Sequence, residues 1–371
     1  MSSAHKAQKI GRLTPLKDVL ERIAAEISPV AGREIALAEA LGRVLAADVV
    51  AKANHPAKAI SLRDGFAVRA EDTSDASSYA PAPLTKAKAV QVGDAMPADA
   101  DAVAVSDGVT KEGNAVAAIT AVAAGDGVLA ASADVQAGKP LRKTGEKLRQ
   151  IDLATLQALG VKTVNARVPR VRVVAAKTSD MILDAAASLA KQIVVAASGD
   201  VVEDRPSDLR VALSSGGADF IIVVGGSGMG ERDAAIATLQ DIGHLHFHGI
   251  GIAPGETSAL GFVDGVPVLI VAGRIDATFA ALVTMGDAIL ARLSGRRGEV
   301  PAMTVTLARK VVSTIGLVEI VPVQLQDSGA MPLANGYLPM QAMMRADGYI
   351  VVPADSEGFP AGSVVAMRTM P

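Results

Sequence analysis

The sequence predicts an α/β and β multidomain protein, in which a three-layer α/β domain lies between a β-rich insert and a C-terminal β-barrel-like domain. The length of 371 residues exceeds what one hydrophobic core usually organises. Short apolar runs alternate with helical patterns between 170 and 295, which is typical of a parallel sheet covered by helices. Short strands and turns dominate 51–134 and the segment after 300, so both read as β domains.

These changes of pattern predict four domains. We expect a discontinuous helical linker domain at 1–50 plus 135–168, the β-rich insert at 51–134, the α/β domain at 169–297 and the C-terminal β domain at 298–371.

The linker domain is expected to contain amphipathic segments. The segment from Leu13 opens a helix, with Thr14 predicted as its N-cap and Pro15 at the first helical position. A second amphipathic segment spans 36–45, and a helix is predicted over 152–159 with Asp152 as its N-cap.

Strands and helices are predicted to alternate within the α/β domain. The expected strands cover 171–175, 193–197, 220–224, 245–252 and 266–271, and the expected helices cover 181–191, 208–215, 231–241 and 278–293.

A glycine-rich turn follows the strand at 220–224. Gly225, Gly226, Gly228 and Gly230 precede a helical pattern that opens at Glu231. Backbone N–H groups in such a turn can approach a phosphate at a helix N-terminus. The turn lacks a Walker lysine and the dinucleotide glycine spacing, so a tight strand-to-helix turn without a ligand is the alternative.

Three loops are predicted to lie together. The loops at 225–233, 253–258 and 272–276 each follow an expected strand. In an open α/β sheet, ligands bind outside the carboxyl ends of the strands, so we expect these loops to share one rim.

Composition excludes several classes of function. The formal net charge is −3 and aromatic residues make up 2 %, which argues against a nucleic-acid surface. The absence of cysteine excludes disulfides and thiolate metal sites and fits a cytoplasmic protein. The N-terminus lacks a signal-peptide pattern, and no uninterrupted apolar run predicts a membrane span.

Two further features allow sharper interpretations. His244, His246 and His248 would share one face of a strand and could bind zinc or copper, although a half-exposed strand face explains them more simply. Ser227 lies in no nucleophile elbow, and the sequence places no histidine–acid pair to activate it.

Four features in order carry a resemblance to a known family. They are Ser61-Leu-Arg-Asp-Gly-Phe-Ala-Val-Arg69, Arg142-Lys-Thr-Gly-Glu146, Gly225-Gly-Ser-Gly-Met-Gly-Glu-Arg-Asp233 and Ala346-Asp-Gly-Tyr349. Together they resemble the MoeA family of molybdopterin molybdenumtransferases, which includes the E domain of gephyrin. The resemblance extends from about residue 13 to 370, so the chain is similar to a divergent member.

The resemblance implies a role in molybdenum cofactor biosynthesis. Members bind adenylylated molybdopterin and hydrolyse off AMP with the help of a divalent cation, which is expected to be Mg²⁺. They then insert molybdate at the dithiolene of molybdopterin. They are elongated homodimers, and the α/β domain is then the molybdopterin-binding one. A molybdoenzyme or a molybdopterin adenylyltransferase is a further implied partner.

The resemblance also assigns candidate site residues. Asp64, Asp233 and Glu146 match catalytic positions, and Asp64 and Asp233 suit Mg²⁺. The candidate substrate-binding residues are Gly225, Gly226, Ser227, Gly228, Gly230, Arg142, Pro254, Gly255, Gly273 and Arg274. Arg63 and Lys143 are further cations for an anionic substrate. Each acidic residue also fits a structural role in a turn, a charged loop or a helix's first turn.

The chain departs from the family in three segments, at 177–181, 254–257 and 272–275. Glu256 stands where the family has a lysine and would repel an oxyanion, whereas Arg274 could supply the lost positive charge. Two alternatives therefore stay open: a non-catalytic molybdopterin carrier or assembly protein for a molybdoenzyme, and a nucleotide or pyrophosphate hydrolase on the same α/β domain.

Overall fold

The computed structural model describes residues 10–113, 115–176, 180–203, 206, 208–230, 233–298 and 300–371. The chain forms two compact units. The first consists of Met1–Ala47, Thr144–Ala154 and Val161–Pro371, and the second of Asp48–Lys143 and Thr155–Gly160. The predicted division into four domains stays a prediction.

A six-stranded mixed sheet is the centre of the first unit. Its strands lie in the order β15 (Asp200–Val201), β14 (Arg170–Ala175), β16 (Phe220–Val224), β20 (Val266–Val271), β19 (Ala259–Val263) and β17 (His244–His248). The first four are parallel, and β19 and β17 are antiparallel additions at one side.

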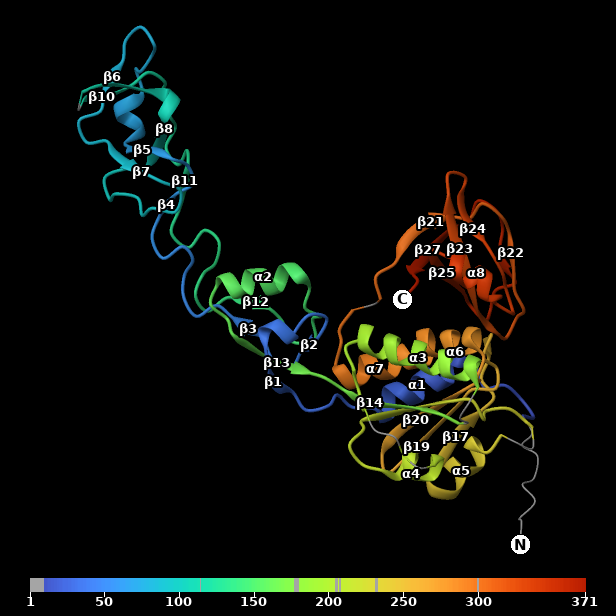
Figure 1. Cartoon of the computed structure of the whole chain (residues 1–371). Coiled ribbons are helices and arrows are strands. Elements are labelled where there is room, and N and C mark those ends of the chain that lie inside the picture. Colours follow the sequence, from blue (N-terminus) through green and yellow to red (C-terminus); the bar gives the residue numbers. More distant parts are fainter. Residues whose placement is uncertain are drawn as a thin grey trace. The chain divides into compact units, whose positions relative to one another are not determined.

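Helices cover both faces of this sheet (Figure 1). On one face lie α1 (Leu16–Glu26), α3 (Met181–Ala196) and a continuous helical stretch made of α6 (Ile275–Ala281), a π-helical turn (Leu282–Gly286) and α7 (Asp287–Ser294); on the other lie α4 (Leu209–Ser214) and α5 (Ala235–Ile242). Phe220 and Ile222 pack toward the first face, and Ile221 and Val223 toward the second. The predicted three-layer α/β domain is confirmed.

Several predicted elements are wrong in detail. Residues 193–196 continue α3 instead of forming a strand, because Ile193 and Val194 extend its buried stripe. The segment 245–252 is not one strand, because Gly249 has a φ of 88° between β17 and the following residues. The strand β19 was not predicted, and α5 begins at Ala235, while 231–232 lie outside the described residues.

The predicted N-caps are also corrected. Pro15 occupies the N-cap position of α1, since Thr14 is hydrogen-bonded as a strand residue to the carbonyl of Gly249. Helix α2 (Gln150–Ala158) begins before Asp152, whose carboxylate accepts hydrogen bonds from the Arg149 backbone and guanidinium.

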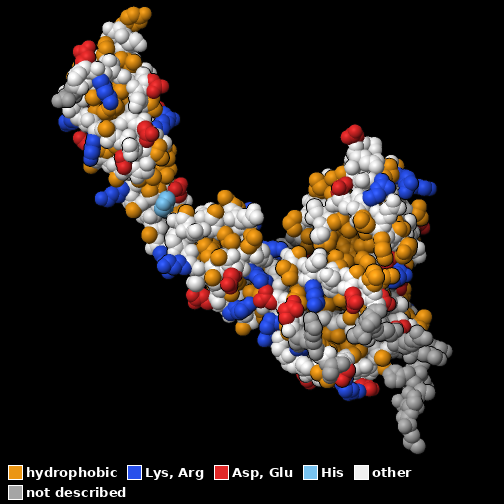
Figure 2. Space-filling view, viewed as in Figure 1, with side chains coloured by type: hydrophobic (Ala, Val, Ile, Leu, Met, Phe, Trp, Pro, Cys, Tyr) orange, Lys and Arg blue, Asp and Glu red, His pale blue; other side chains and the backbone are white. Residues whose placement is uncertain are grey.

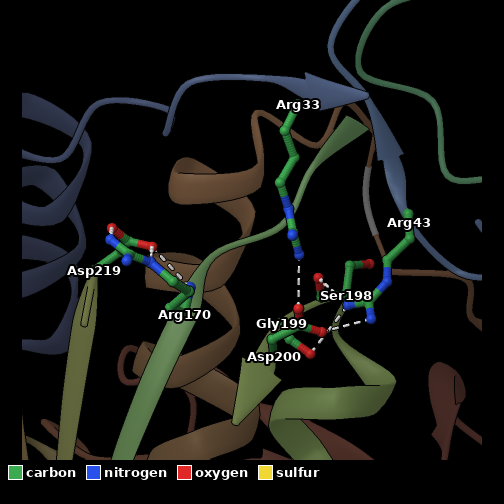
Figure 3. Close-up of polar contacts among 7 residues, drawn as sticks. All are labelled: Arg33, Arg43, Arg170, Ser198, Gly199, Asp200 and Asp219. Atoms are coloured by element: carbon green, nitrogen blue, oxygen red, sulfur yellow. Dashed lines mark hydrogen bonds and ion pairs between the residues drawn. The ribbon is translucent and has the colours of Figure 1, made fainter. Parts of the chain in front are cut away.

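The predicted amphipathic segment at 36–45 contains the end of one strand, a short 3₁₀ turn and a second strand. A three-stranded sheet has the order β1 (Arg33–Ala36), β13 (Thr163–Arg167) and β2 (Val44–Leu45), with a short 3₁₀ turn at Leu37–Glu39. Arginines attach this sheet to the edge of the α/β sheet (Figure 3). Arg33 and Arg43 both bind the Asp200 carboxylate, at 2.9 and 2.5 Å, and Arg43 also donates to the carbonyl of Ser198 at 3.1 Å.

A second sheet forms the C-terminal part of the first unit. It has the order β18 (Ile252–Ala253), β23 (Val318–Gln326), β25 (Gly348–Val352), β27 (Val364–Thr369) and β21 (Met303–Thr306), with β24 (Gly329–Pro332) paired to β23; β22 (Val311–Val312) pairs with β26 (Gly358–Phe359). Ile320 and Tyr349 face the helices of the α/β domain, and Tyr349 meets Phe279 edge to face at 5.4 Å.

Exposed apolar side chains gather in this C-terminal part (Figure 2). Tyr337 and, on α8 (Met340–Arg345), Met340 and Met344 are among the exposed apolar residues.

The second unit is β-rich, as predicted for the insert. Its strands are β3 (Val49–Val50), β4 (Ile60–Ser61), β5 (Gly65–Val68), β6 (Ala82–Pro83), β7 (Lys88–Val90), β8 (Ala102–Val105), β9 (Val109–Glu112), β10 (Ala115–Ala118), β11 (Val128–Leu129) and β12 (Pro140–Arg142). Phe66, Leu84 and Ala104 belong to its core.

One helical stretch, Ile275–Ser294, is long and apolar enough to span a membrane by length and composition. In this protein 67 % of its most apolar window is buried, and Phe279, Leu282 and Met285 pack in the core between the two sheets. It is therefore a core helix of the first unit.

Candidate functional site

The glycine-rich turn begins directly after β16. Gly225 and Gly226 have φ angles of 92° and 71°, in the left-handed region that favours glycine. A Cβ at Gly226 would lie 3.0 Å from the Ala235 Cβ at the start of α5, so the glycine also permits close packing. The two glycines therefore allow both the sharp turn and its close packing against the start of α5.

Three loops meet in this region, as their order along the chain predicted. The hydroxyl groups of Ser227 and Thr257 are hydrogen-bonded at 2.9 Å. The Gly225 N–H donates to the Val271 carbonyl at 2.8 Å, immediately before the loop that contains Gly273. A Cβ at Gly273 would lie 3.6 Å from the Cα of Gly225. The turn after β16, the loop at 253–258 and the loop at 272–276 thus form one cluster, called the loop site below.

The loop at 253–258 has an unusual backbone. The Ala253–Pro254 peptide bond is cis, and Gly255 has a φ of 119°. The Gly255 N–H donates to the Glu256 carboxylate at 3.1 Å. One oxygen of Glu256 is thereby held by the loop itself.

Arg274 is fixed at the start of the third loop. Its Nε and Nη2 donate to the two oxygens of Asp276 at 3.0 and 2.9 Å, and its guanidinium lies 5.3 Å from the Tyr337 ring centroid. The hydrogen bonds to Asp276, helped by the more distant charge of Glu256, raise the pKa of Arg274. Its side chain is 57 % exposed, so Arg274 presents a permanent charge with a fixed orientation.

Asp276 is a buried residue that the sequence did not single out. Its side chain is 4 % exposed, and it also accepts hydrogen bonds from the backbone N–H groups of Ala277 and Leu338, at 2.9 and 3.2 Å. Leu338 comes from the C-terminal part of the chain. Asp276 therefore connects the loop site to the segment that precedes α8.

A buried glutamate lies beside the same loops. Glu319 is opposite Ala253 where β18 pairs with β23, and it is 4 % exposed. Burial, together with the negative charge of Glu256, raises the pKa of Glu319. Among its described residues, the loop site thus contains the exposed Arg274 and several carboxylates.

The predicted acidic residues are distributed over both units. Asp233, in the first unit, accepts a hydrogen bond from the Gly230 N–H at 3.2 Å, and Glu146 lies in the same unit. Asp64, in the second unit, is exposed and accepts from the Val92 N–H at 2.9 Å. The structure therefore shows a turn-stabilising contact for each of the two aspartates.

The predicted substrate-binding cations of the second unit, Arg63, Arg142 and Lys143, lie in different local structures. Arg63 forms an ion pair with Asp126 at 3.1 Å. Arg142 ends β12 opposite Val49, and Lys143 follows it at the surface. Of the predicted substrate-binding residues, the loop site brings together those from 225–230, 254–255 and 273–274.

The three histidines of β17 do not assemble a metal site with other described residues. Among the described residues, no group of three or more histidine, aspartate and glutamate side chains is arranged to hold a metal ion. A bulge interrupts β17 between Leu245 and Phe247. His246 lies 3.6 Å from the Glu26 carboxylate, whereas His248 is hydrogen-bonded to the Ser227 carbonyl at 2.9 Å. His246 and His248 thus have separate partners, and the described residues of neither unit by itself gather the oxygen ligands that Mg²⁺ takes.

One predicted departure lies outside the described residues in part. Of the segment 177–181, residues 177–179 are not among the described residues. Asp180 is the N-cap of α3, and its side chain accepts hydrogen bonds from the N–H groups of Ile182 and Leu183.

Comparison with known families assigns most of the chain. Residues 14–160 match the MoeA N-terminal region (domain I and II), residues 172–314 match a probable molybdopterin binding domain, and residues 304–368 match the MoeA C-terminal region (domain IV).

Individual relatives span nearly the full chain. A molybdopterin molybdenumtransferase of Staphylococcus epidermidis is 23 % identical over 414 residues, covering 96 % of each chain. The crystal structure of a molybdopterin biosynthesis MoeA protein from Pyrococcus horikoshii has a TM-score of 0.77 at 24 % identity and covers 97 % of this chain and 100 % of its own. A molybdenum cofactor biosynthesis protein from Pyrococcus furiosus has a TM-score of 0.60 at 22 % identity, with the same coverage.

Proposed function

Since the chain belongs to the MoeA family, we propose that it acts in molybdenum cofactor biosynthesis by binding molybdopterin, or its adenylylated form, and inserting molybdate with release of AMP. The substrates are therefore molybdopterin and molybdate. A molybdopterin adenylyltransferase would supply the adenylylated substrate, and a molybdoenzyme would receive the product.

The convergence of the three loops supports this proposal. The hydrogen bond between Ser227 and Thr257 holds the glycine-rich turn against the loop at 253–258, and Gly273 lies beside Gly225. Backbone N–H groups beside the N-terminus of α5 suit the phosphate of the pterin. Arg274 supplies the positive charge that an oxyanion needs, and Asp276 keeps its guanidinium in place.

The finer parts of the proposal concern the catalytic residues, the metal and the assembly. We assign catalysis to Asp64, Asp233 and Glu146, with Asp64 and Asp233 as candidates for Mg²⁺. Each aspartate also accepts a hydrogen bond from a backbone N–H group within its own unit. A homodimer and a cytoplasmic location complete this part of the proposal.

A binding experiment tests the pterin site. Purified protein is incubated with molybdopterin, passed over a gel-filtration column, and assayed for retained pterin fluorescence. Arg274→Gln is expected to weaken retention about tenfold, because it removes a charged hydrogen-bond donor. Arg210→Gln is the matched control, since Arg210 is similarly exposed and its partner is the surface residue Asp241. Absence of retention by the unmodified protein at micromolar concentration would refute the proposal.

Complementation separates catalysis from the two alternatives. The gene is expressed in a strain that lacks its molybdenumtransferase, and growth on nitrate through a molybdoenzyme is measured. Growth supports molybdate insertion. Pterin retention without growth, despite good expression, indicates a carrier, and release of AMP from a dinucleotide without a pterin indicates a hydrolase.

A further inference from the structure

A cavity lined with arginines lies at the C-terminal end of α7. Its volume is about 340 Å³, and it is lined by Pro29, Thr144, Arg167, Ala291, Arg292, Gly295, Arg296 and Arg297. All these residues belong to the first unit, and none belongs to the three loops of the loop site. We call it the arginine cavity.

Two glycines make room for its arginines. Gly295 ends α7 with a φ of 64°, and a Cβ there would lie 2.9 Å from Nη1 of Arg167. Gly145 has a φ of 85°, and a Cβ there would lie 2.6 Å from Cγ of Arg297. The Arg297 N–H donates to the Gly145 carbonyl at 2.9 Å. Two turns distant in sequence thus place two guanidinium-bearing side chains at one cavity.

Positive charge exceeds negative charge in the arginine cavity. Arg296 binds both oxygens of Asp287, at 2.9 and 2.7 Å, and Arg292 donates from Nε to the Ile27 carbonyl at 3.1 Å. Arg167 and Arg297 form no ion pair with any described residue. The described lining contains these four arginines and no carboxylate, and they are opposed by Asp287, the partner of Arg296, and by the negative end of α7, which is equivalent to about half a charge.

Two basic groups, Arg296 and Lys147, describe the surroundings at this end of α7 further. The buried Nε of Arg296 has no hydrogen-bond partner among the described residues. Burial lowers the pKa of Lys147, and the positive charge of Arg296 lowers it further, against an opposing effect of Asp287. The larger effect of Arg296 shows that Asp287 does not fully offset its positive charge at Lys147.

We propose that the arginine cavity binds a tetrahedral oxyanion of the phosphate class, either as an inorganic ion or as the phosphoryl group of a small metabolite. Guanidinium groups match such oxygens bidentately. The lining contains no aromatic side chain, so recognition rests on charge and not on stacking with a base. This site is separate from the proposed pterin site and does not depend on it.

Calorimetric titration of the full-length protein at constant ionic strength tests the proposal. Pyrophosphate is the first probe, followed by phosphate, molybdate and ADP. We expect saturable binding of one pyrophosphate per chain at this site, weakened about tenfold by Arg297→Gln and by Arg167→Gln, since each removes charged hydrogen bonds. Arg297 is exposed, so its variant keeps the test valid if Arg167→Gln fails to fold. Tighter binding of ADP than of phosphate identifies a metabolite, and the reverse order identifies an inorganic ion.

Two control variants make the result decisive. Arg210→Gln is expected to leave pyrophosphate binding unchanged, because Arg210 lies outside the arginine cavity, and Arg274→Gln reports any anion that binds at the loop site instead. The proposal is overturned if no saturable binding is found, if Arg297→Gln binds like the unmodified protein, or if Arg210→Gln weakens binding equally. Loss of binding in Arg274→Gln alone would place the anion at the loop site and would also overturn it.

Discussion

Arg274 and Arg297 flank opposite ends of one continuous helical stretch, and their surroundings differ. Arg274 precedes its N-terminus and is held by the buried carboxylate of Asp276. Arg297 follows its C-terminus and forms no ion pair with the described residues. A cation is unfavourable at the positive end of the helix dipole and favourable at the negative end. Arg274, at the N-terminus, therefore needs a carboxylate from the protein. At the C-terminus several arginines can lie together, because the helix dipole stabilises their charge.

This difference predicts unequal costs of substitution, and the largest is expected at Asp276. Asp276→Asn replaces a carboxylate oxygen that faces donors from Arg274 and Leu338 with an amide that also donates. We expect a loss of about 3 kcal/mol in the free energy of unfolding, because buried donors are left without acceptors. Urea unfolding followed by circular dichroism measures it.

The matched control for Asp276→Asn is Arg274→Gln. The arginine side chain is more than half exposed, so its loss is expected to cost less than about 1 kcal/mol. Equal losses in the two variants would show that Asp276 serves only the ion pair and does not anchor the segment before α8.

A second prediction concerns the buried carboxylate beside the loop site. Glu319 has a pKa raised above its ordinary value of 4.5, chiefly by burial. The folded protein therefore holds this proton to a higher pH than the unfolded chain does. The stability that Glu319 contributes is present below its unfolded pKa and is lost as the pH rises through the folded pKa.

Glu319→Gln removes this dependence. Relative to the unmodified protein, the variant is expected to become more stable as the pH rises from 4 to 8, by about 1.4 kcal/mol for each unit by which folding raises the pKa. Chemical unfolding at several pH values provides the measurement. Glu357→Gln is the control, because Glu357 is an exposed glutamate in the same C-terminal part of the chain. A constant difference between Glu319→Gln and the unmodified protein across this range would contradict the prediction.

The loop site and the arginine cavity also differ in how much of each could be predicted from the sequence. The strands at 220–224 and 266–271 match their predicted bounds, because continuous β-branched runs are typical of a sheet's interior. Their order also predicted that the loops after them would meet. Asp276 was missed, since its partner Leu338 is 62 residues away and no local pattern signals that contact.

The arginine cavity had no sequence signal of its own. Gly295-Arg-Arg-Gly298 lies at the predicted boundary between the α/β domain and the C-terminal domain, and Arg167 lies on a strand more than a hundred residues earlier. Their proximity depends on tertiary packing around the end of α7. Conversely, the apolar residues 193–196 predicted a strand because their run is β-branched, although their buried positions continue the stripe of α3.

The smallest effect is expected at Arg297. Because its side chain has no carboxylate partner among the described residues, Arg297→Gln is expected to change the free energy of unfolding by less than about 0.5 kcal/mol. Any change should be stabilising at low salt, since the substitution relieves repulsion from Arg167, Arg292 and Arg296. It should diminish at about 1 M salt, where the Debye length falls to about 3 Å. Urea midpoints at the two salt concentrations measure the effect. A loss above 1 kcal/mol at both concentrations would mean that Arg297 supports the fold as Asp276 does, and the contrast between the two ends of the helix would then fail.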